Sequence, residues 1–156
     1  MKKIKAIVLD FDGVLTDGTF IWGTDGQEYK RLSFYDIMGI SRGLKAGLVF
    51  ALISGENNSL IDRFVEKMGI IDVYKGCKNK AEALCLFAEK HAFDHSQICF
   101  MGDDINDLPA MEIAGFSAAP ATAQEIVKVN AKLITKHAGG QGAVRELIDY
   151  VLANNF

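Results

Sequence analysis

Short apolar runs alternate with longer amphipathic segments along this chain. Three runs are brief and almost wholly apolar, as is typical of strands buried on both faces of a sheet; they are 4–9 (IKAIVL), 49–53 (VFALI) and 98–101 (ICFM). Residues 116–119 and 133–135 are weaker strand candidates. Apolar positions at helical spacing predict helices over about 36–45, 59–68, 80–91, 107–114, 122–127 and 143–152. Strands that alternate with helices predict a three-layer α/β fold around a central parallel sheet.

One segment departs from this alternation. Residues 19–32 hold two strand-like runs, TFIW and QEYKRL, on either side of the sequence GTDG. Asp25 and Gly26 form a dipeptide that is typical of tight turns between antiparallel strands. We therefore predict a protruding β-hairpin over about 19–32. The sequence holds no repeat and no low-complexity tract, so we expect one domain over residues 1–156.

Composition narrows the class of protein. A chain of 156 residues with 49% hydrophobic and 24% charged side chains is typical of a globular domain with its own core. A net charge of −3 without a Lys/Arg-rich run argues against nucleic acid as a partner. No apolar stretch approaches the roughly 20 residues of a membrane span, and the first one ends at Asp10, so we expect no signal peptide. The three cysteines form no CxxC pair, which favours reduced thiols in a cytoplasmic protein.

Polar and acidic side chains follow the three strongest strand candidates, where ligands bind in open α/β sheets. They are Asp10, Asp12, Ser54, Asp103, Asp104 and Asp107. Carboxylates this close require a compensating cation, and hard oxygen ligands favour Mg²⁺ over zinc or copper. The alternative is that each acid caps the helix that follows it. The agreement among three strand ends favours the metal site.

The same residues offer a nucleophile and phosphate ligands. Asp10 and Asp12 reach one site if the chain turns at Gly13, so that one carboxylate attacks and the other moves a proton. Ser54 precedes a predicted helix, where its hydroxyl and nearby N–H groups can bind a phosphate oxygen. Lys80 begins a helix, which is unfavourable for a cation. It therefore either serves the site or is a solvated side chain.

Four motifs resemble those of the haloacid dehalogenase superfamily and occur in the order expected of it. The sequence DFDGVLTDG at 10–18 is similar to the first motif, Ser54 to the second, Lys80 to the third, and GDDIND at 102–107 to the fourth. The resemblance implies a Rossmann-like fold and a Mg²⁺-dependent phosphomonoesterase that works through an aspartyl-phosphate.

The resemblance also implies a role for each motif residue. Asp10 would be the nucleophile, and Asp12 the acid that protonates the leaving alcohol and then activates water. Ser54 and Lys80 would hold the transferred phosphoryl group. The implied Mg²⁺ ligands are Asp10, the backbone carbonyl of Asp12 and Asp103, with Asp104 or Asp107 in support.

The intervals 12–54 and 80–103 are too short for the cap domain that superfamily members usually insert. We therefore expect an open site that another subunit shields from water, with hairpin edges available for pairing. The capless branch with this hairpin resembles phosphatases of phosphorylated 2-keto-3-deoxy sugar acids, which are typically homotetramers. By that resemblance the glycines at 139–142 and Arg145 help to close a neighbour's pocket. The alternative is that they are a linker and a surface residue.

At two positions this chain differs from the residues that are usual in that branch, and these differences bear on the expected substrate. Enzymes for eight-carbon acids usually carry Arg where this chain has Glu56, and a basic residue where it has Tyr35. Glu56 and Lys67 resemble instead the branch for nine-carbon acids, although each also suits its end of a helix dipole. We lean to 2-keto-3-deoxynononate 9-phosphate, with 3-deoxy-D-manno-octulosonate 8-phosphate as the alternative. The expected substrate-binding residues are Gly55, Glu56, Lys67 and Arg145.

Two further classes are weaker. A receiver-type phosphoacceptor carries its phosphorylated Asp on a middle strand, where this chain has Ser54. A non-catalytic oligomerisation module, related to the C-terminal domains of acylneuraminate cytidylyltransferases, would not need the intact motifs. Among the remaining residues, we expect Phe34 in the core and His91 on the surface.

Overall fold

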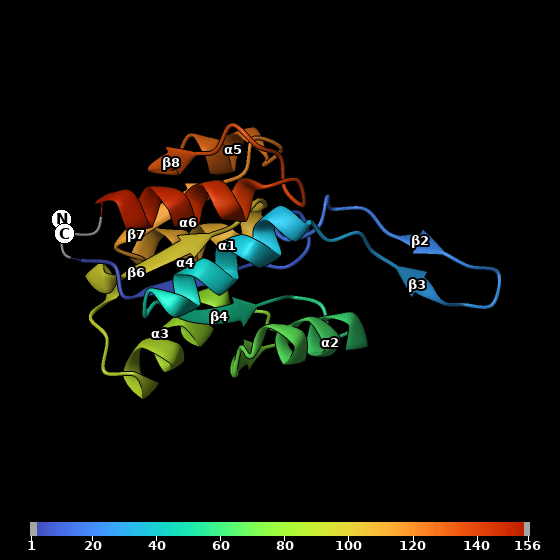
Figure 1. Cartoon of the computed structure of the whole chain (residues 1–156), viewed down its shortest axis with the longest axis horizontal. Coiled ribbons are helices and arrows are strands. Elements are labelled where there is room, and N and C mark those ends of the chain that lie inside the picture. Colours follow the sequence, from blue (N-terminus) through green and yellow to red (C-terminus); the bar gives the residue numbers. More distant parts are fainter. Residues whose placement is uncertain (1–2, 155–156) are drawn as a thin grey trace.

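The computed structural model describes residues 3–154, which surround a six-stranded parallel sheet (Figure 1). The strands are β1 (Ala6–Leu9), β4 (Val49–Ile53), β5 (Asp72–Tyr74), β6 (Ile98–Met101), β7 (Phe116–Ala119) and β8 (Leu133–Ile134). Their order across the sheet is β5-β4-β1-β6-β7-β8, and each neighbouring pair is parallel. The predicted α/β class and central parallel sheet are confirmed.

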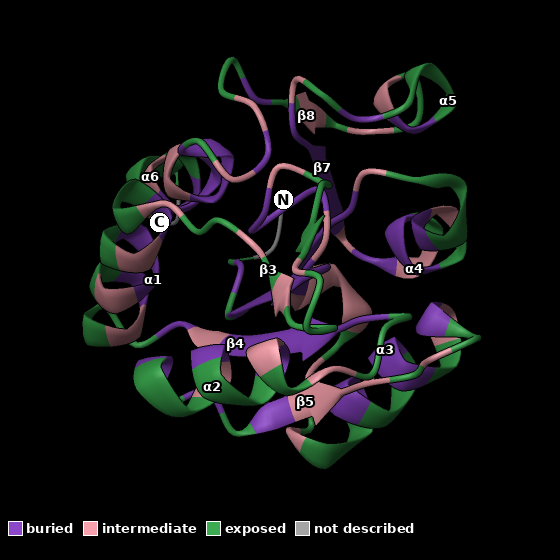
Figure 2. Ribbon diagram, turned by 90° about the vertical axis from the view of Figure 1, so that its right-hand side faces the viewer, coloured by how far each residue is buried: buried purple, intermediate pink, exposed green. Residues whose placement is uncertain are grey.

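Helices cover both faces of the sheet and complete the three layers. They are α1 (Phe34–Lys45), α2 (Ser59–Met68), α3 (Lys80–Lys90), α4 (Leu108–Ile113), α5 (Glu125–Lys128) and α6 (Ala143–Asn154), with two 3-10 turns, η1 (His95–Gln97) and η2 (Ile105–Asp107). Alternate side chains of β1 enter different cores: Ile7 and Leu9 pack with α1, α2 and α6, whereas Ala6 and Val8 pack with α3, α4 and α5. Figure 2 shows the buried strands between these helices. Burial on both faces explains the continuous apolar runs in the sequence.

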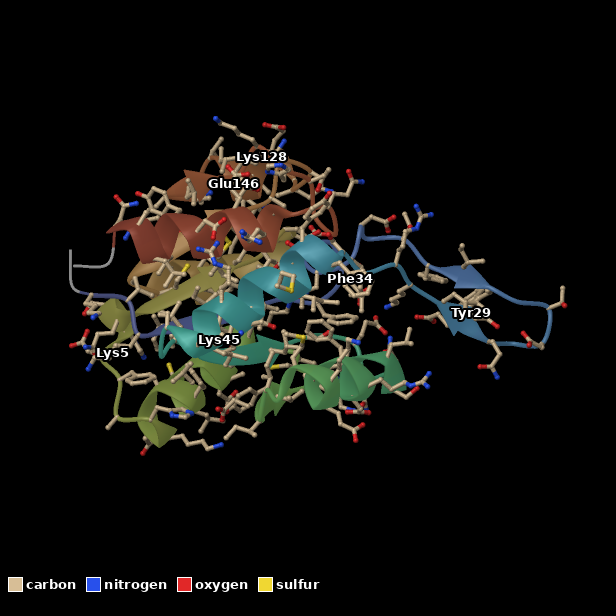
Figure 3. The ribbon with its side chains drawn as sticks, in the orientation of Figure 1. Lys5, Tyr29, Phe34, Lys45, Lys128 and Glu146 are labelled. Atoms are coloured by element: carbon tan, nitrogen blue, oxygen red, sulfur yellow. The ribbon has the colours of Figure 1, made fainter. Side chains whose placement is uncertain are left out.

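The hairpin projects away from the sheet, as the blue ribbon of Figure 1 shows. Strands β2 (Ile21–Trp22) and β3 (Glu28–Tyr29) pair antiparallel, with Ile21 opposite Tyr29. Gly26 adopts a positive φ of 80° in the turn, as the Asp-Gly signal predicts. Figure 3 shows Tyr29 on the projecting part of the chain, where residues 26–30 line a pocket together with the start of α2. The apolar side chains of this hairpin are exposed to solvent: Phe20, Ile21, Trp22 and Tyr29.

The structure corrects several details of the sequence prediction. β5 is missing from it because this edge strand is only three residues long and begins with Asp72. The predicted helix over 107–114 is divided, since Asp107 ends η2 and α4 begins at Leu108. Phe34 is not a core residue: it begins α1 on the side of the hairpin and is 75% exposed. His91 is half-buried, and its Nε2 lies 2.8 Å from Oδ2 of the buried Asp72. Within residues 3–154 no helix is both long and apolar enough to cross a membrane.

Candidate active site

The carboxyl ends of β1, β4 and β6 meet at one edge of the sheet. Parallel register places Leu9 beside both Leu52 and Met101, so the residues that follow these strands converge. A pocket opens at this edge, lined by Asp10, Asp12, Gly18, Ser54, Gly55, Glu56, Lys80, Asp103, Asp104 and Asn106. Most of this lining is predicted from the sequence, with the exception of Gly18 and Asn106. The GDDIND motif that contains Asn106 is the signal that points to the latter.

Lys80 is a buried cation between two buried carboxylates. Its Nζ lies 2.9 Å from Oδ1 of Asp10 and 2.6 Å from Oδ1 of Asp107. The side chain of Asn79 caps α3, which brings Lys80 to the pocket in the first turn of this helix. Burial disfavours the ammonium, but the charges of Asp10 and Asp107 outweigh it and raise the pKa of Lys80. Lys80 is thus part of the pocket, and the alternative of a solvated side chain is wrong.

Three carboxylates form a cluster at the base of the pocket. Asp10, Asp103 and Asp107 each place an oxygen within 4.8 Å of the others. Burial and the charge of Asp107 raise the pKa of Asp10 well above its usual range, and that of Asp103 to about 6. One lysine among three carboxylates leaves an excess of negative charge, which a cation would neutralise. Because these ligands are hard oxygens, the cluster suits Mg²⁺ better than zinc or copper.

The two acids after Asp103 differ in position. Asp107 is fully buried, and its Oδ2 accepts hydrogen bonds from the backbone N–H groups of Asp103 and Asp104, over 2.9 and 3.2 Å. A Cβ on Gly102 would overlap this carboxylate, so the glycine makes room for it. Asp104 lies on the rim, where its Oδ1 accepts from the N–H of Ile105 over 2.7 Å and caps η2. Asp107 therefore belongs to the cluster, and Asp104 only to the lining of the pocket.

Asp12 faces the pocket from the loop after β1. Gly13 turns this loop with a φ of +87°, as two neighbouring carboxylates at one site require. The Oδ1 of Asp12 accepts hydrogen bonds from Lys30 Nζ over 2.7 Å and from Thr16 Oγ1 over 3.3 Å. Its Oδ2 is buried and has no hydrogen-bond partner in the described part of the chain.

Lys30 is a further residue at this site that was not predicted from the sequence. It follows β3 of the hairpin, 18 positions after Asp12, and no spacing rule connects the two. Burial disfavours its ammonium, but hydrogen bonds and charges from Asp12 and Glu28 outweigh this and raise the pKa of Lys30.

The mouth of the pocket follows β4. Ser54 is buried, and its Oγ accepts a hydrogen bond from the N–H of Glu56 over 3.1 Å. Gly55 and Glu56 are exposed and lie on the pocket lining. Ser54 thus lies on the inner lining of the pocket mouth, with Gly55 and Glu56 outside it.

Two predicted substrate-binding residues lie apart from this lining. Lys67 is exposed in the last turn of α2, at the opposite end of that helix from Glu56. Arg145 is held within its own chain: its Nε lies 2.7 Å from Oδ2 of Asp149, and its N–H donates to Oδ1 of Asp36 over 2.9 Å.

The glycines at 139–142 contact the chain's own loop after β1. Gly140 N–H donates to the carbonyl of Val14 over 2.9 Å, and a Cβ on Gly139 would overlap the carbonyl oxygen of Gly13. The alternative of a simple linker does not describe this packing. The segment supports the loop that carries Asp12 within the same chain.

Residues 23–148 match the family described as haloacid dehalogenase-like hydrolase. The chain is 36% identical over 151 residues to the 3-deoxy-D-manno-octulosonate 8-phosphate phosphatase of Escherichia coli K12. This match covers 97% of the present chain and 80% of the relative. The corresponding Moraxella catarrhalis phosphatase, in complex with magnesium ion, phosphate ion and KDO, has a similar structure, with a TM-score of 0.93, 32% identity and coverage of 96% and 86%. The cobalt-bound Haemophilus influenzae phosphatase gives a TM-score of 0.93, 32% identity and coverage of 97% and 88%.

Proposed function

The chain belongs to the haloacid dehalogenase-like hydrolases and is a phosphatase, and we propose that its substrate is the eight-carbon sugar acid 3-deoxy-D-manno-octulosonate 8-phosphate. The observation that carries this proposal is the similarity to the octulosonate phosphatases over 97% of the chain. The acids, the hydroxyl and the ammonium that line the pocket support phosphoryl transfer through an aspartate.

The carboxylate cluster is the proposed Mg²⁺ site. Asp10, Asp103 and the backbone carbonyl of Asp12 would hold the ion, with Asp107 closer to it than Asp104. When bound there, Mg²⁺ supplies positive charge that stabilises the oxygens of the transferred phosphoryl group. Burial, and after it the charge of Asp107, raise the pKa values of Asp10 and Asp103, and a cation at this place would offset both effects.

The reaction follows from the positions of two carboxylates. A carboxylate oxygen of Asp10 attacks phosphorus, and Asp12 gives its proton to the ester oxygen as the P–O bond breaks and the sugar acid leaves as an alcohol. Asp12 then takes a proton from water as the water oxygen attacks the aspartyl-phosphate, which releases phosphate and restores Asp10. Lys80 and Ser54 bind phosphoryl oxygens during both steps.

One observation favours the nine-carbon acid as a second candidate. Glu56 lines the mouth of the pocket, where an acidic side chain disfavours a carboxylate held close to the phosphate. Lys67, the other residue behind the lean to nine carbons, does not line this pocket. The similarity to octulosonate phosphatases supports eight carbons, so the nine-carbon substrate takes second place.

We also propose that residues 1–156 form one cytoplasmic domain that assembles as a homotetramer through the hairpin. The exposed apolar side chains of β2 and β3 support this assembly, because contact with another copy would remove them from water. The open pocket supports it too, since a neighbouring subunit would limit the access of water.

Phosphate release tests the substrate. The two acids are compared at matched concentrations, with Mg²⁺ and after its removal by chelation, and Asp10→Asn serves as the inactive control. We expect kcat/KM for the eight-carbon ester to exceed that for the nine-carbon ester by about tenfold or more, or about 1.4 kcal/mol. The reverse order would assign the nine-carbon acid. Phosphate release from an aryl phosphate alone would exclude both sugar acids as substrates but would still support a phosphatase.

A further inference from the structure

We propose that Lys30 is a positioning residue for the proton transfer, because its ammonium holds the Asp12 carboxylate by one oxygen at the edge of the pocket. This inference rests on the proposed phosphatase mechanism, in which Asp12 is the acid. It adds a residue from the hairpin to a site otherwise built from the ends of the parallel strands.

The ammonium of Lys30 is held by carboxylates in a nearly closed environment. Its Nζ lies 2.7 Å from Oδ1 of Asp12 and 3.3 Å from Oε1 of Glu28, and its side chain is only 5% exposed. A buried ammonium is costly unless it is paired. The shorter of the two contacts joins Lys30 to Asp12, so this pair determines where the Asp12 carboxylate lies.

Both donors converge on the same oxygen of Asp12. Thr16 Oγ1 donates to Oδ1 over 3.3 Å, beside the 2.7 Å contact from Lys30. The other oxygen, Oδ2, is buried without a hydrogen-bond partner among residues 3–154. Buried polar atoms normally have a partner, and one without it indicates a function.

The contact with Lys30 makes the two oxygens of Asp12 different. An oxygen that already accepts from an ammonium and a hydroxyl has its lone pairs occupied, whereas Oδ2 has none engaged. Asp12 lines the pocket, so the position in which Lys30 holds its carboxylate decides how the acid meets the ester oxygen. Loss of Lys30 would let the carboxylate rotate and would remove this distinction between its two oxygens.

Two esters separate this role from a structural one. The sugar acid phosphate has an alcohol leaving group that needs a proton, whereas p-nitrophenyl phosphate releases a stable anion without one. For Lys30→Met we expect kcat/KM to fall about 10- to 100-fold with the sugar ester, and less than about threefold with the aryl ester. Lys30→Arg, which keeps a cation and a donor, should regain most of the lost activity.

The control is Lys128→Met, which removes the Lys128–Glu125 surface pair. It should leave kcat/KM unchanged with both esters. If kcat/KM falls equally with both esters, or does not fall, the proposed role of Lys30 is overturned. Activity of the wild-type protein in the same assay would still support the proposed phosphatase function. A wild-type protein inactive on both esters would instead overturn the proposed function. If Lys30→Met unfolds, Lys30→Gln is judged by the same ratio, and unfolding of both would show that Lys30 is structural and overturn the proposal.

Discussion

The backbone N–H of Gly140 donates a hydrogen bond to the carbonyl of Val14 over 2.9 Å and ties the segment before α6 to the loop after β1. Gly139 packs even closer to this loop, with no room for a Cβ against Gly13. Gly13 in turn lies against the Asp103 carboxylate, where a Cβ would also overlap. We therefore expect a change at the C-terminal glycines to displace the carboxylate cluster.

The substitution Gly139→Ala should displace the loop that carries Asp12. We expect kcat/KM to fall at least about tenfold, with a loss of about 1–3 kcal/mol in the free energy of unfolding, because the added methyl group meets backbone and not a mobile side chain. Phosphate release and urea unfolding measure the two effects. Gly69→Ala is the control: it costs about 1 kcal/mol at the left-handed C-cap of α2 but leaves kcat/KM unchanged. Full activity in Gly139→Ala would contradict the role of this packing.

Asp36 anchors the same segment from α1. This buried carboxylate accepts hydrogen bonds from the N–H groups of Gly142 and Arg145, over 3.1 and 2.9 Å, and burial raises its pKa. Asp36→Ala leaves both donors without their acceptor and should cost about 2 kcal/mol of unfolding free energy. Asp36→Asn should cost less, since its amide oxygen still accepts. The control is Ser33→Ala, which removes the N-cap of α1. Urea unfolding should show that this variant loses about 1 kcal/mol of unfolding free energy.

Asp10→Asn should separate catalysis from stability. Phosphate release should cease, because the amide is no nucleophile. The Tm of the metal-free protein should rise by a few degrees, roughly, since the cluster with Asp103 and Asp107 loses one charge. The increase in Tm on addition of Mg²⁺ should diminish. Asp62→Asn, in an exposed pair with Lys75, should leave both properties as in the wild type. An unchanged response to Mg²⁺ in Asp10→Asn would argue against this metal site.

Trp22→Lys tests the hairpin as the assembly surface. Trp22 is 70% exposed on β2, and a charge there should oppose burial against another copy. Light scattering after size-exclusion chromatography should show a smaller assembly. Circular dichroism should show a nearly unchanged helix content. Ile71→Lys, a similarly exposed apolar residue next to β5, should leave the assembly intact. A tetramer that survives Trp22→Lys would exclude the hairpin tip as its main contact.

The contact of Glu146 with His137 gives stability a pH dependence. Burial opposes ionisation of Glu146, but hydrogen bonds from His137 and from the N–H of Lys136 outweigh it and lower its pKa below the ordinary 4.5. A carboxyl with a lowered folded-state pKa stabilises the protein above pH 4.5, and this contribution is lost as pH falls below that value. Glu146→Gln should therefore have a lower free energy of unfolding than the wild type at pH 7. The difference between the two proteins should be smaller at pH 3.5. Urea unfolding at both values tests this, with the exposed Glu125→Gln as the control.

The apolar pattern predicts the strands over 49–53 and 98–101 with the bounds that the structure has. Strands buried on both faces need no polar positions, so their limits are plain in the sequence. The edge strand β5 lacks this signal, because it is short and begins with Asp72. The convergence of Asp10, Ser54 and Asp103 is likewise predictable, since parallel register brings the ends of neighbouring strands together.

The sequence by itself therefore determined the class of fold, the hairpin and most of the pocket lining, because these follow from periodicity and from the order of strand ends. The tertiary structure alone decided that Lys30 meets Asp12, that Asp107 and not Asp104 joins the cluster, and that Lys67 lies elsewhere. Contacts of this kind depend on how side chains from separate elements extend into shared space, and neither hydrophobic period nor sequence spacing records that direction.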